Sequence, residues 1–181
     1  MEKTKQTFTT KMITEAGLML ALATVLSMVK LYQMPQGGIV TLASCLPIIF
    51  FSIRWGIGKG MIVGALFGMI QLLVDPYVIH PIQLILDYPL PYAMLGISAF
   101  SFKKDKKDIT GYLPFIILSY VLMFISHYFS GIIFFAENAG ELAVSVYSAL
   151  YNSYIGVDCI IAVVVLLLLW KPLNKLIENK I

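Results

Sequence analysis

Residues 81–92 read Pro-Ile-Gln-Leu-Ile-Leu-Asp-Tyr-Pro-Leu-Pro-Tyr, an apolar segment with one carboxylate, Asp87, in its middle. If the segment crosses a bilayer, that carboxylate is costly to bury, and such groups usually face a cavity or a partner. Gln83 lies four residues earlier, on the same helical face. Pro89 and Pro91 each remove a backbone donor and loosen the helix beside the acid. We interpret the segment as part of a binding cavity; an Asp that only pairs with a neighbouring helix is the alternative.

The composition is that of a membrane protein. Of the 181 residues, 59% are hydrophobic and 13% are charged, whereas about a quarter of the residues of a soluble domain carry charge. A spanning helix takes roughly 20 residues, so six spans with short loops use most of the chain. We predict an all-α, polytopic membrane protein that forms one six-helix domain, residues 1–181. The expected spans are about 12–29, 39–53, 61–74, 81–102, 112–135 and 146–170.

The basic residues predict the orientation. In the six-span arrangement they lie on one side, except for Lys30. Those on the common side are Lys3, Lys5, Lys11, Arg54, Lys59, Lys103, Lys104, Lys106, Lys107, Lys171, Lys175 and Lys180. By the positive-inside rule both termini are cytoplasmic. The loops near residues 30–38, 75–80 and 136–145 are then external.

Polar residues of several spans share one depth in this arrangement. Asp87 lies about 9 Å from the external end of its span, and His127 lies roughly 12 Å from the same face. Tyr147 and Asn152 open the sixth span, and Tyr77 lies in the external loop before the fourth. This convergence predicts a wet or ligand-filled pocket open to the outside. For His127 alone, a hydrogen bond within the helix bundle is the alternative.

The sixth span carries a geometric conflict. Tyr147 and Asn152 lie about 140° apart on an ideal helix, so both face one cavity only if the helix starts irregularly near Tyr147. Tyr151, Tyr154 and Asp158 share the face of Tyr147. Asp158 lies deeper, and we interpret it as structural or interhelical. In the first span, Glu15 lies near the cytoplasmic interface and is interpreted as an anchor.

Signatures of covalent or metal chemistry are missing from the sequence. It contains no HExxH, GxSxG or CxxC motif, and the glycine-rich residues 54–60 lack the spacing of a phosphate-binding loop. Cys45 and Cys159 sit in apolar runs without metal-ligand spacing, which is typical of packing residues. We therefore predict a protein that is not an enzyme and that has no metal, cofactor or nucleic-acid partner.

Five motifs occur in a recognisable order. They are Met34-Pro-Gln-Gly-Gly38, Ser52-Ile-Arg-Trp-Gly56, His80-Pro-Ile-Gln-Leu-Ile-Leu-Asp-Tyr88, His127-Tyr-Phe-Ser-Gly-Ile-Ile-Phe-Phe135 and Tyr147-Ser-Ala-Leu-Tyr-Asn-Ser-Tyr154. Together they resemble the thiamine-specific S components of bacterial energy-coupling-factor (ECF) transporters. The resemblance runs from the first external loop to the sixth helix. It implies a six-helix protein of the bacterial cell membrane that binds thiamine near the outer face, with a transmembrane coupling protein and two cytoplasmic ATPases as partners.

The resemblance also implies which residues bind thiamine and which contact the coupling protein. The implied thiamine contacts are Tyr77, Asp87, Tyr88, His127, Phe135, Tyr147 and Asn152. Some members of the family have Glu in place of Asp87 and Trp in place of Phe135, but the carboxylate and the aromatic character are kept here. Small residues of the first helix, Gly17 and Ala21, are implied to dock the coupling protein. Internal packing of that face is the alternative, and the row of Gly60, Gly64 and Gly68 is a rival docking surface.

Other functions stay open from the sequence. A self-contained proton-coupled thiamine carrier would use Asp87 and His127 as a proton relay, and an S component could also serve another small vitamin. The alternative outside transport is an intramembrane enzyme that uses the same two residues as acid and base. Uptake driven by a pH gradient, or turnover of a bound vitamin, would distinguish these functions.

Overall fold

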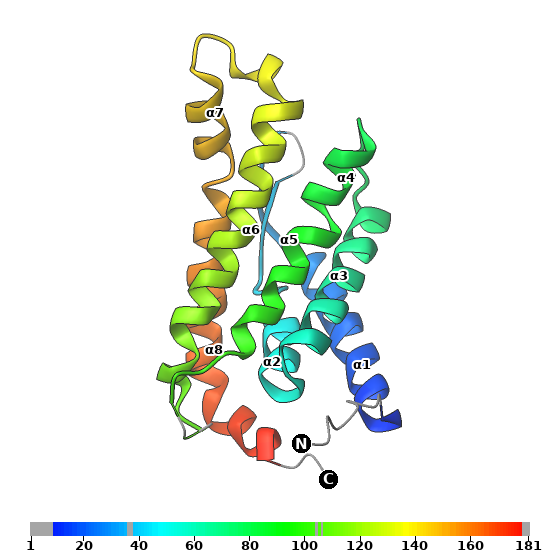
Figure 1. The fold of residues 1–181 in the computed structure, drawn as a ribbon, viewed down its shortest axis with the longest axis vertical. Helices are drawn as coiled ribbons and strands as arrows, with labels where there is room; N and C mark the ends of the chain where they lie inside the picture. The colour runs from blue at the N-terminus through cyan, green and yellow to red at the C-terminus, as the bar shows by residue number, and fades with distance from the viewer. Residues whose placement is uncertain (1–8, 36–37, 104, 106, 179–181) are drawn as a thin grey trace, which may run out of the picture.

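The computed structural model describes residues 9–35, 38–103, 105 and 107–178. Lys3, Lys5, Lys104, Lys106 and Lys180 of the charge pattern, and Gln36 and Gly37 of the first external loop, lie outside these ranges. Helices α1, α3, α6 and α8 form the body of the molecule, and the shorter elements lie between and around them (Figure 1). The elements are α1 Thr10–Ser27, β1 Lys30–Gln33, β2 Ile39–Thr41, α2 Leu46–Trp55, α3 Ile57–Val74, α4 Pro81–Asp87, α5 Pro89–Ala93, η1 Met94–Ala99, η2 Ile109–Gly111, α6 Leu113–Phe134, η3 Ala136–Ala139, α7 Val144–Tyr151 and α8 Tyr154–Glu178.

The helical, polytopic fold class is confirmed. Four stretches are long and apolar enough to cross a membrane: Thr10–Ser27, Ile57–Val74, Ile109–Phe134 and Val144–Ile177. The only helix in the second expected span is α2, an apolar helix of ten residues. The fourth consists of α4, α5 and the 3₁₀ helix η1. All six expected helical segments are therefore present, but the second and fourth are not continuous spans.

The expected start of the second span was wrong. Residues 39–41 form strand β2, which pairs antiparallel with β1, so that Gln33 faces Ile39 and Lys30 faces Thr41. The β-branched run Ile39-Val40-Thr41 suits an extended backbone better than a helix. The chain then turns at Ala43, which has a φ of 56°, and α2 begins with Pro47 in its first turn, where proline fits.

The break in the fourth span was expected. Tyr88 leaves the helical region, with φ −119° and ψ −83°, because a residue before proline is disfavoured there and Pro89 has no N–H. α4 begins after His80, whose Nδ1 atom accepts a hydrogen bond of 3.1 Å from the Ile82 amide. The result is a short helix with its C-terminal residue, Asp87, at a bend in the chain.

The sixth span is interrupted, but not near Tyr147, where an irregular start was expected: Tyr147 lies within the regular helix α7, Val144–Tyr151. α7 ends at Tyr151, and Asn152 and Ser153 separate it from α8. The side-chain amide of Asn152 donates a hydrogen bond of 2.9 Å to the Ser148 carbonyl, a local bond of the kind that competes with regular helix geometry. The break separates Tyr147 and Tyr151 on α7 from Tyr154 and Asp158 on α8.

The row of glycines in α3 is used inside the molecule. A β-carbon added at Gly64 would lie 2.2 Å from the Tyr92 carbonyl oxygen, and one added at Gly68 would lie 2.2 Å from that of Tyr88. A β-carbon added at Gly60 would lie 2.3 Å from the Ser52 hydroxyl oxygen on α2 and 3.0 Å from the Gly96 Cα atom on η1. Gly64 and Gly68 thus let α3 pack on the backbone of Tyr92 and Tyr88, and Gly60 lets it approach α2 and η1, so the row is not an exposed docking surface.

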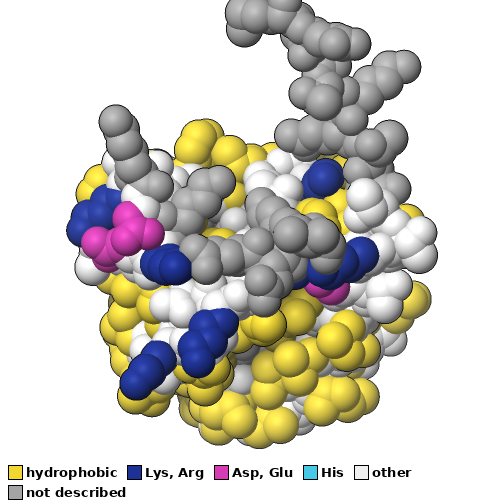
Figure 2. Space-filling view, turned by 90° about the horizontal axis from the view of Figure 1, so that it is seen from below, with side chains coloured by type: hydrophobic (Ala, Val, Ile, Leu, Met, Phe, Trp, Pro, Cys, Tyr) yellow, Lys and Arg dark blue, Asp and Glu magenta, His cyan; other side chains and the backbone are white. Residues whose placement is uncertain are grey.

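Helix α1 begins and helix α8 ends at the same end of the molecule (Figure 1). Figure 2 looks onto this end and shows Lys and Arg side chains gathered there. The Glu15 carboxylate of α1 forms an ion pair with Arg54, with Nε at 2.8 Å, and accepts a hydrogen bond of 2.7 Å from Trp55 Nε1. The interpretation of Glu15 as an anchor therefore agrees with a contact that holds α1 against α2.

Candidate functional site

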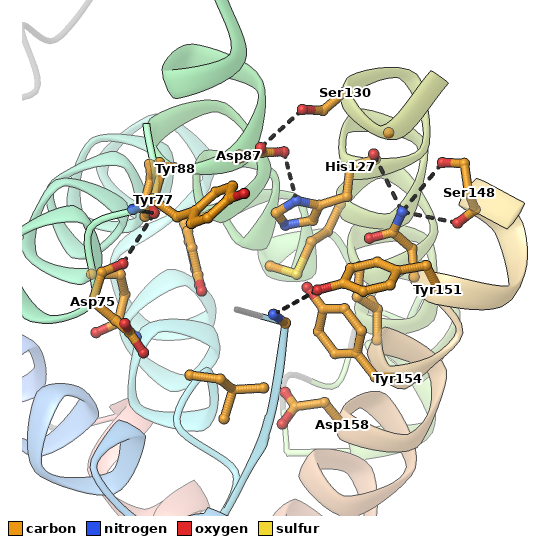
Figure 3. A pocket seen from close by; sticks show the side chains of 18 of the residues that line it. Asp75, Tyr77, Asp87, Tyr88, His127, Ser130, Ser148, Tyr151, Tyr154 and Asp158 are labelled. Carbon is orange, nitrogen blue, oxygen red and sulfur yellow. Dashed lines mark hydrogen bonds and ion pairs between the residues drawn. The ribbon is translucent and has the colours of Figure 1, made fainter. Parts of the chain in front are cut away.

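A cavity lies between the β-hairpin and helices α3, α4, α6, α7 and α8, in the half of the molecule away from the chain ends (Figures 1 and 3). The β-hairpin closes one side and the loop between α3 and α4 closes another. Side chains with aromatic rings, hydroxyls and carboxylates predominate in its wall. The lining residues are Gly38, Ile39, Thr41, Ser44, Cys45, Gln71, Asp75, Tyr77, Gln83, Asp87, Tyr88, Tyr92, Met123, His127, Ser130, Gly131, Phe135, Tyr147, Ser148, Tyr151, Asn152, Tyr154, Ile155 and Asp158.

Asp87 is the centre of a hydrogen-bond network between α4 and α6. Its Oδ2 atom accepts from Gln83 Nε2 at 2.6 Å and from Ser130 Oγ at 2.9 Å. Its Oδ1 atom lies 3.0 Å from Nδ1 of His127. Charge-assisted bonds of this kind are the stronger ones in proteins. The carboxylate thus fixes the orientation of the imidazole, and both groups face the cavity (Figure 3).

The loop before α4 is tied to the same network. Gln83 donates a second hydrogen bond, of 3.0 Å, to the Tyr77 carbonyl, and its Oε1 atom accepts from the Ile79 amide at 3.1 Å. The Tyr88 hydroxyl accepts from the Tyr77 amide at 2.8 Å and donates to the Asp75 carbonyl at 3.1 Å. Gln83 is 1% exposed. The loop is therefore held by side chains that are themselves buried.

Helix α7 is held against α6 by close contact. A β-carbon added at Gly131 would lie 2.2 Å from Ser148 Oγ. That hydroxyl donates a hydrogen bond of 2.8 Å to the Tyr128 carbonyl. Asn152 also donates to the His127 carbonyl, at 3.3 Å. Gly131 and Ser148 thereby bring Asn152 next to the backbone of His127.

The hairpin is fastened to α7 and α8 at two points. The Gly38 amide donates to the Tyr151 hydroxyl at 3.1 Å, and the Thr41 amide donates to Asp158 Oδ1 at 3.0 Å. A β-carbon at Gly38 would lie 2.6 Å from the ring of Tyr154, so only glycine allows this close approach. Asp158 Oδ2 also accepts from the Tyr120 hydroxyl of α6 at 3.4 Å, which is an interhelical contact of the kind expected of it, and Asp158 lines the cavity.

Aromatic rings make up much of the cavity wall. The rings of Tyr77 and Phe135 stack with 5.8 Å between centroids and 28° between planes. Tyr147 and Tyr151 lie 5.9 Å apart, and the ring of Tyr154 meets that of Tyr151 edge-on at 6.3 Å. Such faces carry negative potential and attract cations.

The structure brings the seven predicted contact residues together. They all line this one cavity: Tyr77, Asp87, Tyr88, His127, Phe135, Tyr147 and Asn152. Gly17 and Ala21 lie elsewhere, exposed on α1. A β-carbon added at Gly17 would meet no described atom within 4 Å. The role of each residue in binding remains a prediction.

Several lining residues escaped the sequence analysis. Ser130 lies three residues after His127, so helical periodicity could have placed it on the same face. Thr41 and Ser148 carried no such signal, because a hydroxyl in an apolar run commonly bonds to its own backbone. Asp75 was predicted only as the start of a loop.

Comparison with known proteins agrees with this architecture. Residues 13–178 match the family model described as thiamine transporter protein (Thia_YuaJ). The chain belongs to this family. It is 32% identical to the thiamine transporter ThiT of Bacillus subtilis (strain 168) over 179 residues, which cover 91% of this chain and 93% of that protein.

The fold of this member of the thiamine transporter family is also that of a solved relative. The structure of ThiT from Listeria monocytogenes superposes with a TM-score of 0.77 and covers 92% of this chain and 97% of its own. The two sequences are 20% identical, so this likeness concerns the fold alone. With four helices fit to cross a membrane, the chain is a multi-pass membrane protein.

Proposed function

We propose that this protein is the substrate-binding subunit of an ECF-type ABC transporter. It captures thiamine at the extracellular side, and a separate coupling protein and two ATPases energise uptake. Family membership supports the substrate, because the matching family and its Bacillus relative are named as thiamine transporters. The main observation behind the proposal is that Asp87, His127 and Asn152 line the same cavity as several aromatic rings.

The polar end of the cavity suits the aminopyrimidine of thiamine. That ring presents an amino donor beside ring-nitrogen acceptors. Among the described residues, Asp87 Oδ1 is hydrogen-bonded to His127 only, and a carboxylate oxygen has further acceptor capacity. A charge-assisted hydrogen bond from the amino group to Asp87 is therefore available, with Gln83, Ser130 and His127 holding the carboxylate in place.

The aromatic walls suit the thiazolium ring, which carries a permanent positive charge. A cation over a desolvated aromatic face gains about 2 kcal/mol. Tyr147, Tyr151 and Phe135 offer such faces, and none of the lining residues that the structure describes is Lys or Arg. The cavity therefore stabilises a small aromatic cation better than an anion of the same size.

The proposed partners are inferred from the missing phosphate-binding motif and from the exposed small-residue face of α1. Its sequence has no phosphate-binding loop, so a separate ATPase supplies the energy. The basic end that carries both termini faces the cytoplasm under the positive-inside rule, and the cavity then opens outward. The small-residue face of α1, with Gly17 and Ala21 exposed, is the proposed contact with the coupling protein.

Two measurements test the proposal. Calorimetry on the purified protein should give one thiamine per chain, with biotin, an anionic vitamin, as the control. Binding of another vitamin but not of thiamine would assign the subunit to that vitamin. Proteoliposomes that contain this chain alone should not concentrate thiamine, even under a pH gradient. Concentrative uptake there would make the protein a self-contained carrier, with Asp87 and His127 as its proton relay.

A further inference from the structure

Three carboxylates line the cavity, and they differ in how their charge is compensated. Asp75 lies 2.8 Å from Lys30 Nζ, in an exposed ion pair. Asp87 lies 3.0 Å from the His127 imidazole, which becomes cationic on protonation. Asp158 has neither kind of partner among the described residues: its hydrogen bonds are to one amide and two hydroxyls.

The surroundings of Asp158 fit an ionised carboxylate. Its Oδ1 atom lies 3.0 Å from both the amide and the hydroxyl of Thr41, and Oδ2 lies 3.4 Å from the Tyr120 hydroxyl. The Thr41 amide and the Tyr120 hydroxyl can donate to it, and so can the Thr41 hydroxyl, which also lies 2.7 Å from Ser44 Oγ, whereas an ionised carboxylate only accepts. Asp158 itself is 7% exposed. A negative charge is thus held by neutral donors and sits close to the cavity.

The position of Asp158 separates it from the polar end of the cavity. Figure 3 shows it at the base, below Tyr151 and Tyr154, whereas Asp87 and Ser130 lie at the opposite side. Charges in a partly dehydrated site interact over roughly 10 Å, because the effective dielectric constant is well below that of water. A cation bound against the tyrosines therefore interacts with Asp158 without touching it.

We propose that Asp158 is the counter-charge of the binding cavity and makes it selective for a cationic ligand. This inference rests on the proposed thiamine function and adds a specificity-determining residue to it. Of the three lining carboxylates, Asp158 has neither a lysine nor an imidazole neighbour among the described residues, and the thiazolium compensates its charge on binding. Burying the two charges together offsets part of the cost of burying either one alone.

A purely structural role predicts something different. Asp158 also fastens β2 to α8 through Thr41. If that fastening is its whole contribution, its loss should weaken every ligand of the cavity by the same factor. A counter-charge weakens only the cationic ligand, so two ligands of equal shape and different charge separate the roles.

The test compares thiamine with deazathiamine, its neutral analogue with carbon in place of the thiazolium nitrogen. Asp158→Asn keeps the shape and an oxygen acceptor for Thr41 while removing the charge. Calorimetry should show that this variant loses about tenfold more affinity for thiamine than for deazathiamine. Equal losses for both ligands would overturn the inference. Failure of the unaltered protein to bind thiamine would instead refute the proposed function.

Matched variants assign the charge to this position. Asp75→Asn removes a lining carboxylate that Lys30 already compensates, so the ratio of the two affinities should change little. An equal change of the ratio in both variants would overturn the assignment to Asp158. Asp158→Glu and Asp158→Ser both disturb the contacts with Thr41, but only Ser removes the charge. The ratio of thiamine affinity to deazathiamine affinity should therefore fall in Asp158→Ser and not in Asp158→Glu. This pair keeps the test decisive if Asp158→Asn does not fold.

Discussion

At the scale of single residues, the cavity depends on a carboxylate that several neighbouring side chains hold in place. Asp87 accepts hydrogen bonds from Gln83 and Ser130 and contacts His127. Each neighbour comes from α4 or α6, so the carboxylate is oriented before any ligand arrives. Such preorganisation lowers the cost of ordering the site on binding.

The first prediction concerns this carboxylate. Asp87→Asn removes the charged acceptor and turns an amide donor towards groups that are themselves donors. Thiamine affinity should fall by about 1.5–3 kcal/mol, the value of a hydrogen bond to a charged group. Calorimetry measures this, and thermal unfolding checks that the variant is folded. Glu141→Gln, at an exposed position outside the cavity lining, is the matched control. Equal thiamine affinity in Asp87→Asn and the unaltered protein would remove Asp87 from the site.

At the scale of elements, the site depends on breaks in helices as much as on the helices. α4 ends at Asp87 because Pro89 follows Tyr88. α3 fits against this bend because Gly68 has no side chain. A continuous helix through the fourth span would satisfy the backbone equally well, but it would not turn the end of α4 into the cavity.

The second prediction follows from that contact. In Gly68→Ala the new β-carbon would lie 2.2 Å from the backbone oxygen of Tyr88, so α3 must move away from α5. Overpacking of this kind costs about 1–3 kcal/mol. Thermal unfolding in detergent should show the loss of stability, together with weaker thiamine binding.

Gly58 provides the control within the same helix. A β-carbon there meets no described atom within 4 Å, and alanine favours helix more than glycine does. Gly58→Ala should therefore be neutral or slightly stabilising. If Gly68→Ala behaved in the same way, the close approach of α3 to Tyr88 would not be a constraint on the fold.

The sequence predicted some of these elements and missed others for identifiable reasons. The break beside Asp87 was predictable because proline acts locally. The angle between Tyr147 and Asn152 suggested an irregularity in the sixth span but placed it near Tyr147, whereas the chain breaks at Asn152 and Ser153. The β-hairpin was missed because Ile39-Val40-Thr41 continues without interruption into an apolar run. Periodicity cannot separate so short a strand from the start of a helix. The contact of Thr41 with Asp158 spans 117 positions, and only tertiary packing determines it.

At the scale of the whole molecule, the two proposed functions use different surfaces. The cavity lies between the hairpin and α3, α4, α6, α7 and α8. The exposed small residues of α1 lie outside this lining. Because Gly60, Gly64 and Gly68 of α3 already pack against other parts of this chain, α1 is the better site for a helix of another protein to approach. Ligand binding and partner docking should therefore be separable by mutation.

The last prediction tests that separation. Two helices in a membrane associate through close packing at small residues, since lipid provides no hydrophobic drive. Leucine at both Gly17 and Ala21 fills the flat face of α1 without a clash at position 17, where a β-carbon meets no described atom within 4 Å. The double variant should keep its unfolding temperature and its thiamine affinity, yet fail to co-purify with the coupling protein.

Gly156→Leu on α8 is the matched control, because Gly156 is also exposed and has the same open space around it. This variant should co-purify with the coupling protein as the unaltered chain does. Loss of thermal stability and thiamine binding together in the α1 variant would mean that its face packs inside this chain. Normal co-purification of that variant would place the docking surface on another helix. If α1 is a dedicated docking helix, only the α1 variant should lose co-purification with the coupling protein, and it should still bind thiamine.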